Sequence, residues 1–209
     1  MLADQVDALL AQPLPWPIVQ AGDPVLRTPA APYEGELSAA ALAGLIEGMK
    51  ETMHAAPGVG LAAPQVGLPV RLAVVEDRAH ERQVPPEALE ARGIAALPFR
   101  VLVNPRYTAL GEERAAFFEG CLSVSGWQAV VARPLRVRLQ ALDETGAAVD
   151  EELSGWPARI VQHETDHLGG MLYLDRAELR SLSTHQAVSQ RWAQPTVELA
   201  AKELGFDLP

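Results

Sequence analysis

The segment from Pro157 to Gly170 constrains the fold most strongly, because it places two histidines one helical turn apart. Residues 163–167 read His-Glu-Thr-Asp-His, and side chains four residues apart lie on the same face of a helix. Pro157 suits a first helical turn, and Gly169-Gly170 is a typical end signal. The sequence therefore predicts a helix that presents His163 and His167 side by side.

Two imidazoles in this arrangement can bind one metal ion, with Glu164 placed beside them to act on a metal-bound water. The same spacing also arises when two histidines simply lie on a solvated or a core helix face. A catalytic site needs a third protein ligand and an open position for water. Cys121 is the only cysteine, and three roles are open to it: a metal ligand, a nucleophile with a histidine base, or a buried apolar side chain.

A glycine-rich segment, residues 58–65, reads Gly-Val-Gly-Leu-Ala-Ala-Pro-Gln. It lacks the Lys-Ser/Thr pair of a phosphate-binding P-loop, and it does not follow a predicted strand as a dinucleotide fingerprint does. We interpret it as a place where backbone approaches a substrate closely, with Gln65 as a hydrogen-bond donor.

Together these segments resemble the three motifs of the peptide deformylase family. The motifs are a glycine-x-glycine-x-Ala-Ala-x-Gln segment, Glu-Gly-Cys-x-Ser at residues 119–123, and the His-Glu motif at residues 163–167. Their order and separations also match, and residues 22–27 resemble the N-terminal segment of the family. The resemblance covers roughly residues 18–176.

The resemblance implies that Cys121, His163 and His167 bind one divalent metal ion, with water at the fourth position. Ferrous iron is typical of the family, and zinc, nickel or cobalt is tolerated. The ligand chemistry alone suits zinc, since zinc binds thiolates and imidazoles well.

The reaction that the resemblance implies is removal of the N-formyl group from the initiator methionine of newly made polypeptides, with release of formate. Glu164 would take a proton from the attacking water and pass it to the leaving amine. The side-chain amide of Gln65 and the backbone N–H of Leu122 would stabilise the oxyanion.

The remaining expected contacts surround this centre. Peptide main chain is expected to lie along residues 58–60 like an added strand. The candidate substrate-binding residues are Val59, Gly60, Gly120, Trp156 and Ile160, and for Trp156 and Ile160 plain core packing is an equal alternative. We also expect Arg133 and Asp166 to form an ion pair that supports the metal ligands.

The chain departs from the family pattern at Gln128. Many bacterial deformylases have an arginine at that position, where it helps to hold substrate. The sequence around Gln128 and a charged insertion at residues 76–98, with one helical turn around residues 86–92, look more like the organellar-type branch.

The expected fold is α+β, with antiparallel strands packed around a central metal-binding helix and with N-terminal and C-terminal helices. We expect one domain over residues 1–209. The predicted helices cover residues 3–11, the segment from Ser38 to Pro57, and, with a break near Pro195, residues 177–206. The predicted strands cover residues 70–75, 100–103 (ended by Asn104-Pro105), 129–132 and 135–139.

Charge and hydropathy narrow the partners. A net charge of −10 disfavours a non-specific nucleic-acid binder, which needs cationic side chains to replace counterions. The N-terminus has no basic signal-peptide region, and no apolar run approaches the length of a membrane span. We therefore expect a cytoplasmic protein with no nucleic acid bound directly. The family resemblance implies that it acts on N-formylmethionyl nascent peptides near the ribosome.

Two other classes remain as alternatives. A zincin-type endopeptidase would share both histidines and Glu164 but take its third ligand from downstream, where Glu178 and His185 are available. A non-catalytic, metal-stabilised module would need four protein ligands, and only three obvious ones occur.

Overall fold

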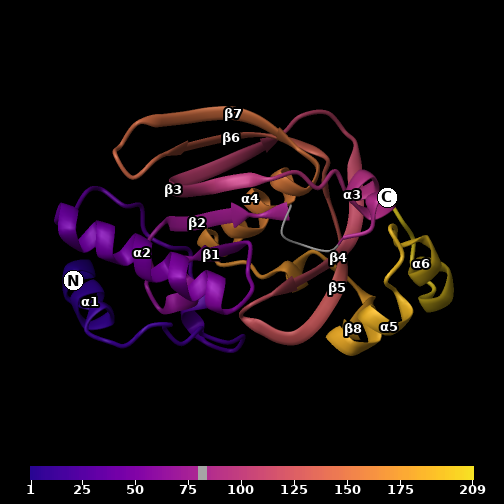
Figure 1. Ribbon diagram of the computed structural model, residues 1–209, viewed down its shortest axis with the longest axis horizontal. Helices are drawn as coiled ribbons and strands as arrows, with labels where there is room; N and C mark the ends of the chain where they lie inside the picture. The colour runs from indigo at the N-terminus through magenta and orange to yellow at the C-terminus, as the bar shows by residue number, and fades with distance from the viewer. Residues whose placement is uncertain (80–83) are drawn as a thin grey trace.

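The computed structural model describes residues 1–79 and 84–209, in which two antiparallel sheets enclose one helix (Figure 1). The five-stranded sheet has the order β1-β2-β3-β6-β7. Its strands are β1 Gly60–Ala62, β2 Leu72–Asp77, β3 Leu97–Ala109, β6 Arg136–Leu142 and β7 Ala148–Ser154. The second sheet consists of β4 Arg114–Cys121, β5 Val124–Pro134 and β8 Ala177–Thr184, in that order.

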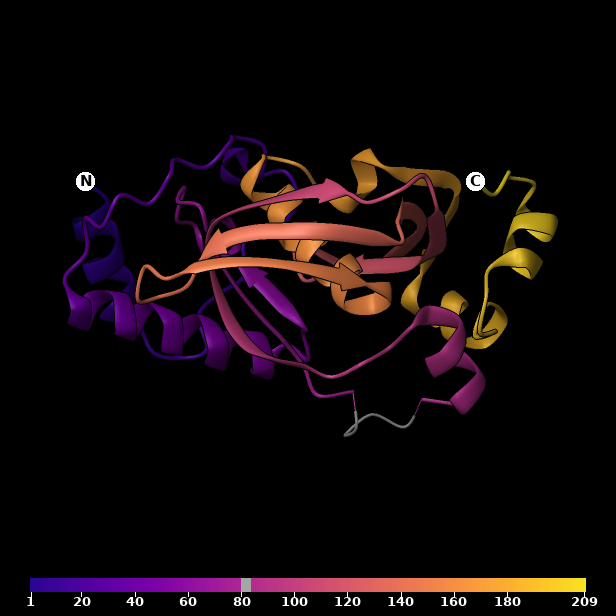
Figure 2. The same ribbon diagram turned by 90° about the horizontal axis from the view of Figure 1, so that it is seen from above.

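Helices cover both faces of the five-stranded sheet and one end of the molecule (Figures 1 and 2). They are α1 Leu2–Leu10, α2 Ala39–Ala55, α3 Pro86–Arg92, α4 Gly155–Leu168, α5 His185–Arg191 and α6 Glu198–Leu204. Short 3-10 turns occur at η1 Pro24–Leu26, η2 Ala63–Val66 and η4 Tyr173–Asp175. The α+β class is confirmed. No helix among the described residues is long and apolar enough to cross a membrane.

The central strands of the large sheet are apolar on both faces because each face is covered by a helix. In β2, Val74 packs in the cluster that contains Met49 and Met53 of α2. Its neighbour Val75 packs in the cluster that contains Val161 of α4. Successive side chains of a strand point to opposite faces, so α2 and α4 lie on opposite sides of this sheet.

The predicted boundaries hold best where a local signal is strong. The Ser38 hydroxyl accepts a hydrogen bond from the Ala41 N–H at 3.1 Å and caps α2 as expected. In β6, Val137 and Leu139 are fully buried between exposed arginines, which confirms the predicted alternation. The 76–98 insertion contains the predicted helical turn as α3; its residues 80–83 lie outside the described residues.

Two predicted boundaries are wrong. Asn104-Pro105 does not end a strand, because β3 continues past it through a register shift between Val103 and Arg106. Asn104 has φ of +50° there, and its side chain exchanges hydrogen bonds of 2.9 and 2.8 Å with the backbone of Tyr33. These bonds stabilise the irregular backbone within the sheet.

Residues 177–184 form strand β8 and not the predicted start of a C-terminal helix. The segment is rich in good helix formers, but β5 offers it a sheet edge. The Ser181 hydroxyl accepts a hydrogen bond of 2.7 Å from the Val130 N–H. Pairing with β5 therefore overrides the local helical preference. The strands over residues 114–121 and 148–154 were not predicted.

Candidate metal centre and catalytic cleft

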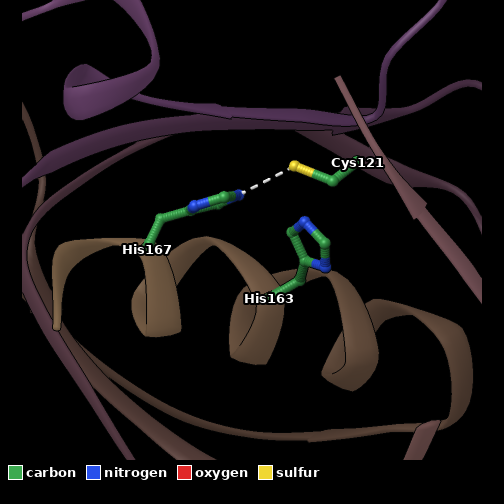
Figure 3. Close-up of side chains that lie close together, drawn as sticks. All are labelled: Cys121, His163 and His167. Carbon is green, nitrogen blue, oxygen red and sulfur yellow. Dashed lines mark hydrogen bonds between the residues drawn. The ribbon is translucent and has the colours of Figure 1, made fainter. Parts of the chain in front are cut away.

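Helix α4 contributes two of three side chains that point toward one another (Figure 3). Its apolar residues pack on the large sheet, which turns the face with His163 and His167 toward β4. The side chain of Cys121, the last residue of β4, meets them there. Cys121 Sγ lies 3.3 Å from His167 Nε2, and one ligand atom from each of the three residues lies within 4.8 Å of the others.

The 3.3 Å separation of Cys121 Sγ and His167 Nε2 suits two ligands of one metal ion. Bonds of about 2.0–2.3 Å in a tetrahedral site place two ligand atoms roughly 3.3–3.8 Å apart. Among the described residues, the candidate metal cluster contains Cys121 and neither Glu178 nor His185. Glu178 lies in β8 and His185 begins α5. The third-ligand position required by the endopeptidase alternative is therefore taken by a thiol.

Glu119 orients His163 from the strand that carries Cys121. Its Oε2 lies 3.1 Å from His163 Nδ1, which leaves Nε2 as the nitrogen that faces the cluster. Arg133 approaches the same carboxylate with two hydrogen bonds, of 2.6 and 3.0 Å. Burial by itself raises the pKa of Glu119, but the charge of Arg133 and the hydrogen bonds from His163 and Arg133 outweigh it and hold that pKa well below its ordinary value.

Arg133 also forms the predicted ion pair, with its Nη1 lying 2.8 Å from Asp166 Oδ2. Both side chains are buried. Tyr107 donates a hydrogen bond of 2.9 Å to the other oxygen of Asp166, and Arg176 approaches the same carboxylate at 3.0 Å. This network, buried at Arg133 and Asp166, ties the end of α4 to β3, to β5 and to the segment after η4.

Glu164 lies on the cleft side of the metal cluster, directly against Gly60. A Cβ atom added to Gly60 would lie 2.3 Å from Glu164 Oε1, so only glycine leaves room for this carboxylate. The other oxygen, Oε2, is buried without a hydrogen-bond partner in the described part of the chain. Burial raises the pKa of Glu164 to about 7, which is the range in which a carboxylate works as an acid and a base at neutral pH.

Gln65 is buried beside Cys121, and hydrogen bonds of its side-chain amide fix its orientation. Its Oε1 accepts a hydrogen bond of 2.8 Å from the Ala62 N–H. This bond directs Nε2 toward Ser123 Oγ at 3.2 Å and Cys121 Sγ at 3.6 Å. Leu122 lies in the turn between β4 and β5, and the next N–H, that of Ser123, donates to Cys121 Sγ at 3.3 Å.

A cleft of about 1030 Å³ opens over this centre. All five predicted substrate-binding residues line it: Val59, Gly60, Gly120, Trp156 and Ile160. Ile160 also packs in the hydrophobic core against the large sheet, so this one side chain both lines the cleft and contributes to the core. Gln128 lines the cleft as well, and its Cγ would lie 3.3 Å from a Cβ added to Gly120.

Two residues of this centre were not singled out from the sequence. Glu119 precedes Cys121 by two residues, a spacing that puts both side chains on one face of a strand. Arg159 precedes His163 by four residues on α4, and it hydrogen-bonds both Glu119 and the Val131 carbonyl. Both spacings can be seen in the sequence. A single sequence, however, does not show which charged side chains will be buried.

The fold and this site define a metal-dependent hydrolase: a thiol and two imidazoles converge on one point, and a buried carboxylate lies beside them in an open cleft. The profile of the family described as "Polypeptide deformylase" matches residues 15–183. The chain belongs to this family.

Relatives agree with this assignment over the whole chain. The chain is 67% identical to "Peptide deformylase 3" of Streptomyces avermitilis, covering 100% of this chain and 92% of that one. It is 62% identical to "Peptide deformylase 1" of Streptomyces coelicolor, covering 100% and 94%. A Met-Ala-Ser-bound peptide deformylase structure from Acinetobacter baumannii matches with a TM-score of 0.69 and 34% identity, covering 79% of this chain and 99% of that one.

The protein is thus a hydrolase that removes the N-formyl group from the initiator methionine of newly made polypeptides and releases formate. The family is metal-dependent, and the cluster of Cys121, His163 and His167 is able to hold the ion.

Proposed function

We propose that Cys121, His163 and His167 bind the single metal ion of this deformylase and leave a fourth position for water. The ligand distances support this, as does the hydrogen bond that fixes His163 through its other nitrogen. When bound, the ion lowers the pKa of water and polarises the formyl carbonyl. The proposed ion is Fe²⁺, as the family resemblance implies; Zn²⁺, Ni²⁺ and Co²⁺ suit the same donors.

Glu164 is the proposed acid and base of the reaction. It accepts a proton from the attacking water and then donates it to the leaving amine of methionine. The observation that carries this role is the buried Oε2 at the cleft, which has no hydrogen-bond partner among the described residues, in a carboxyl group whose pKa burial raises to about 7.

Gln65 and Leu122 are the proposed oxyanion donors. The side-chain amide of Gln65 is directed toward the metal cluster by the bond from Ala62, so little reorganisation is needed when charge develops. The backbone N–H of Leu122 lies in the turn directly after Cys121. The two donors would approach the formyl oxygen from different segments.

The substrate is proposed to enter as an extra strand. Among the described residues, β1 is the edge strand of the large sheet and its strand partner there is β2, so its outer edge is able to accept a peptide main chain. Val59, Gly60, Gly120, Trp156 and Ile160 would then surround the formyl-methionine residue. The Acinetobacter baumannii relative with Met-Ala-Ser bound supports a peptide of this kind.

Glu119, Arg133 and Asp166 are proposed to position the ligands from behind. Glu119 sets the orientation of His163, and Arg133 joins Glu119 to Asp166 in the turn that precedes His167. Polar partners of this kind orient metal ligands and tune their basicity.

The proposed place of action is the cytoplasm, on N-formylmethionyl chains as they emerge near the ribosome. The substrate supports this location, because N-formylmethionyl chains are produced by the ribosome. No direct binding of nucleic acid is proposed, since the chain carries 27 acidic and only 17 basic residues.

Two variants separate the proposed roles. We expect Glu164→Ala to keep the metal and lose formate release, because it removes the proton carrier alone. We expect Cys121→Ser to lower the metal content at equal protein concentration. Metal analysis and a formate assay on formyl-Met-Ala-Ser measure both. Turnover by a metal-loaded Glu164→Ala variant would contradict the assignment of Glu164.

A further inference from the structure

Residues 185–192 of the C-terminal segment form one wall of the outer catalytic cleft. The active-site motifs do not include this segment. His185, Val188, Ser189 and Trp192, all from α5 or the residue that follows it, line the same cleft as Cys121 and Glu164. The family profile ends at residue 183. Both Streptomyces relatives align across this segment, since they cover the whole chain. The wall is therefore an addition to the shared deformylase core.

The residues that follow this wall anchor it to the second sheet. Val197, Ala200 and Phe206, in and around α6, pack on Phe118 of β4 and Val130 of β5 in one apolar cluster. On the other side α3 faces it, at the same end of the molecule (Figure 2).

Arg92 connects α3 to the segment that follows α5. Its side chain donates hydrogen bonds of 3.2 Å to the carbonyls of Gln194 and Pro195. The carbonyl of Gly93 in turn accepts a bond of 3.1 Å from the N–H of Trp156, at the start of α4. Helix α3 and the tail are thus joined to each other and to the metal-binding helix.

The strand register gives the distance from the reaction centre to this wall. Gly120, beside Cys121, pairs with Gln128, and Gln128 pairs with Ser183, two residues before α5. Two strand spacings make roughly 10 Å, which an extended peptide covers in about three residues. Gly120 and Gln128 both line the cleft along the way.

We propose that the C-terminal wall, together with α3, contacts the third and fourth residues of the formylated peptide, and that this joint surface selects apolar over basic side chains there. Val188, Trp192 and Ala88 supply its apolar surface, and Arg92 and His185 are the basic residues that line it. The inference rests on the proposed entry of the peptide along β1. The wall and the metal centre line one continuous cleft, so a peptide whose formyl group reaches the metal centre extends along the wall.

Ser189 is the position at which to test this, because it lines the cleft and is exposed to solvent. Gln190, the next residue of α5, is also exposed and does not line the cleft. Ser189→Glu and Ser189→Lys are compared with Gln190→Glu and Gln190→Lys. The substrates are formyl-Met peptides of five residues with Leu, Lys or Glu at position 2, 3 or 4. The readout is kcat/KM from formate release.

For the unaltered protein, the Leu peptides should exceed the Lys peptides at positions 3 and 4. Ser189→Glu should raise the Lys-to-Glu ratio of kcat/KM by about two- to fivefold at those positions, as expected for a solvent-exposed ion pair. Ser189→Lys should lower that ratio by a similar factor. The change should be smallest at position 2, and the Gln190 variants should leave the ratio unchanged at every position.

Equal ratios for all folded variants would overturn the proposal. An equal response of the Ser189 and Gln190 variants would also overturn it, because a long-range charge effect would then explain both. Thermal melting confirms folding of each variant. Formate release from formyl-Met-Ala by the unaltered protein tests the deformylase activity separately from the wall.

Discussion

Gly60 offers a direct test of how Glu164 is held for catalysis. A Cβ at this position would meet Glu164 Oε1 at 2.3 Å, Cδ at 2.5 Å and Cγ at 2.6 Å. Ordinary contact begins near 3.4 Å, so Gly60→Ala displaces the carboxylate by about 1 Å. Gly60 is not among the glycines with positive φ, and an alanine therefore fits the backbone without strain.

A displacement of about 1 Å at a reacting group can reduce the rate about 100-fold. That factor corresponds to about 2.7 kcal/mol in the activation free energy. We expect Gly60→Ala to lower kcat by this amount while it keeps its metal and its thermal stability. The assay is formate release at saturating formyl-Met-Ala-Ser, together with metal analysis of the same preparation.

Gly58→Ala is the comparison variant. A Cβ there would meet the terminal Cδ1 of Leu122 at 2.9 Å, and a flexible methyl group can move at little cost. We expect its loss of kcat to be well below that of Gly60→Ala. A folded, metal-loaded Gly60→Ala variant with kcat near that of the unaltered protein would refute the argument that Gly60 makes room for Glu164.

Two further predictions concern the buried charges. Arg133→Met should lower the free energy of unfolding by about 3–5 kcal/mol in a urea titration, because Glu119 and Asp166 lose the buried cation that they share. Arg136→Met, which breaks the exposed pair with Glu152, should cost less than about 1 kcal/mol, and equal costs would contradict the network. The second prediction concerns acid stability. Because the pKa of Glu119 is depressed in the folded state, its stabilising contribution is present above the ordinary value of 4.5 and is lost as the pH falls below it. The melting temperature should therefore fall more steeply with acidification in the unaltered protein than in Glu119→Gln, and parallel curves would dismiss this.

The parts of the fold that the sequence predicted are those with a local cause. Ser38 caps α2 through its own side chain, and the alternation of Val137 and Leu139 with arginines follows from one buried sheet face. β8 could not be predicted, because its strand conformation depends on pairing with β5, more than 40 residues earlier in the chain. Asn104 is a similar case, since its bonds to Tyr33 come from a distant segment.

The same distinction applies to the site. The spacing of His163 and His167 predicted one face of a helix, and the resemblance to a family added Cys121. The Arg133–Asp166 pair was expected and is present. Glu119 and Arg159 were missed because their importance comes from being buried together, and burial of a charge is a property of the folded chain.

Deformylation by this chain is proposed to depend on a metal ion held by Cys121, His163 and His167. The most direct measurement is formate release from formyl-Met-Ala-Ser by anaerobically purified protein whose metal content is determined in the same sample. We expect one formate for each new amino terminus, Fe²⁺ at about one ion per chain, and loss of activity on chelation that added Fe²⁺ restores. Iron-loaded protein that releases no formate would contradict the account.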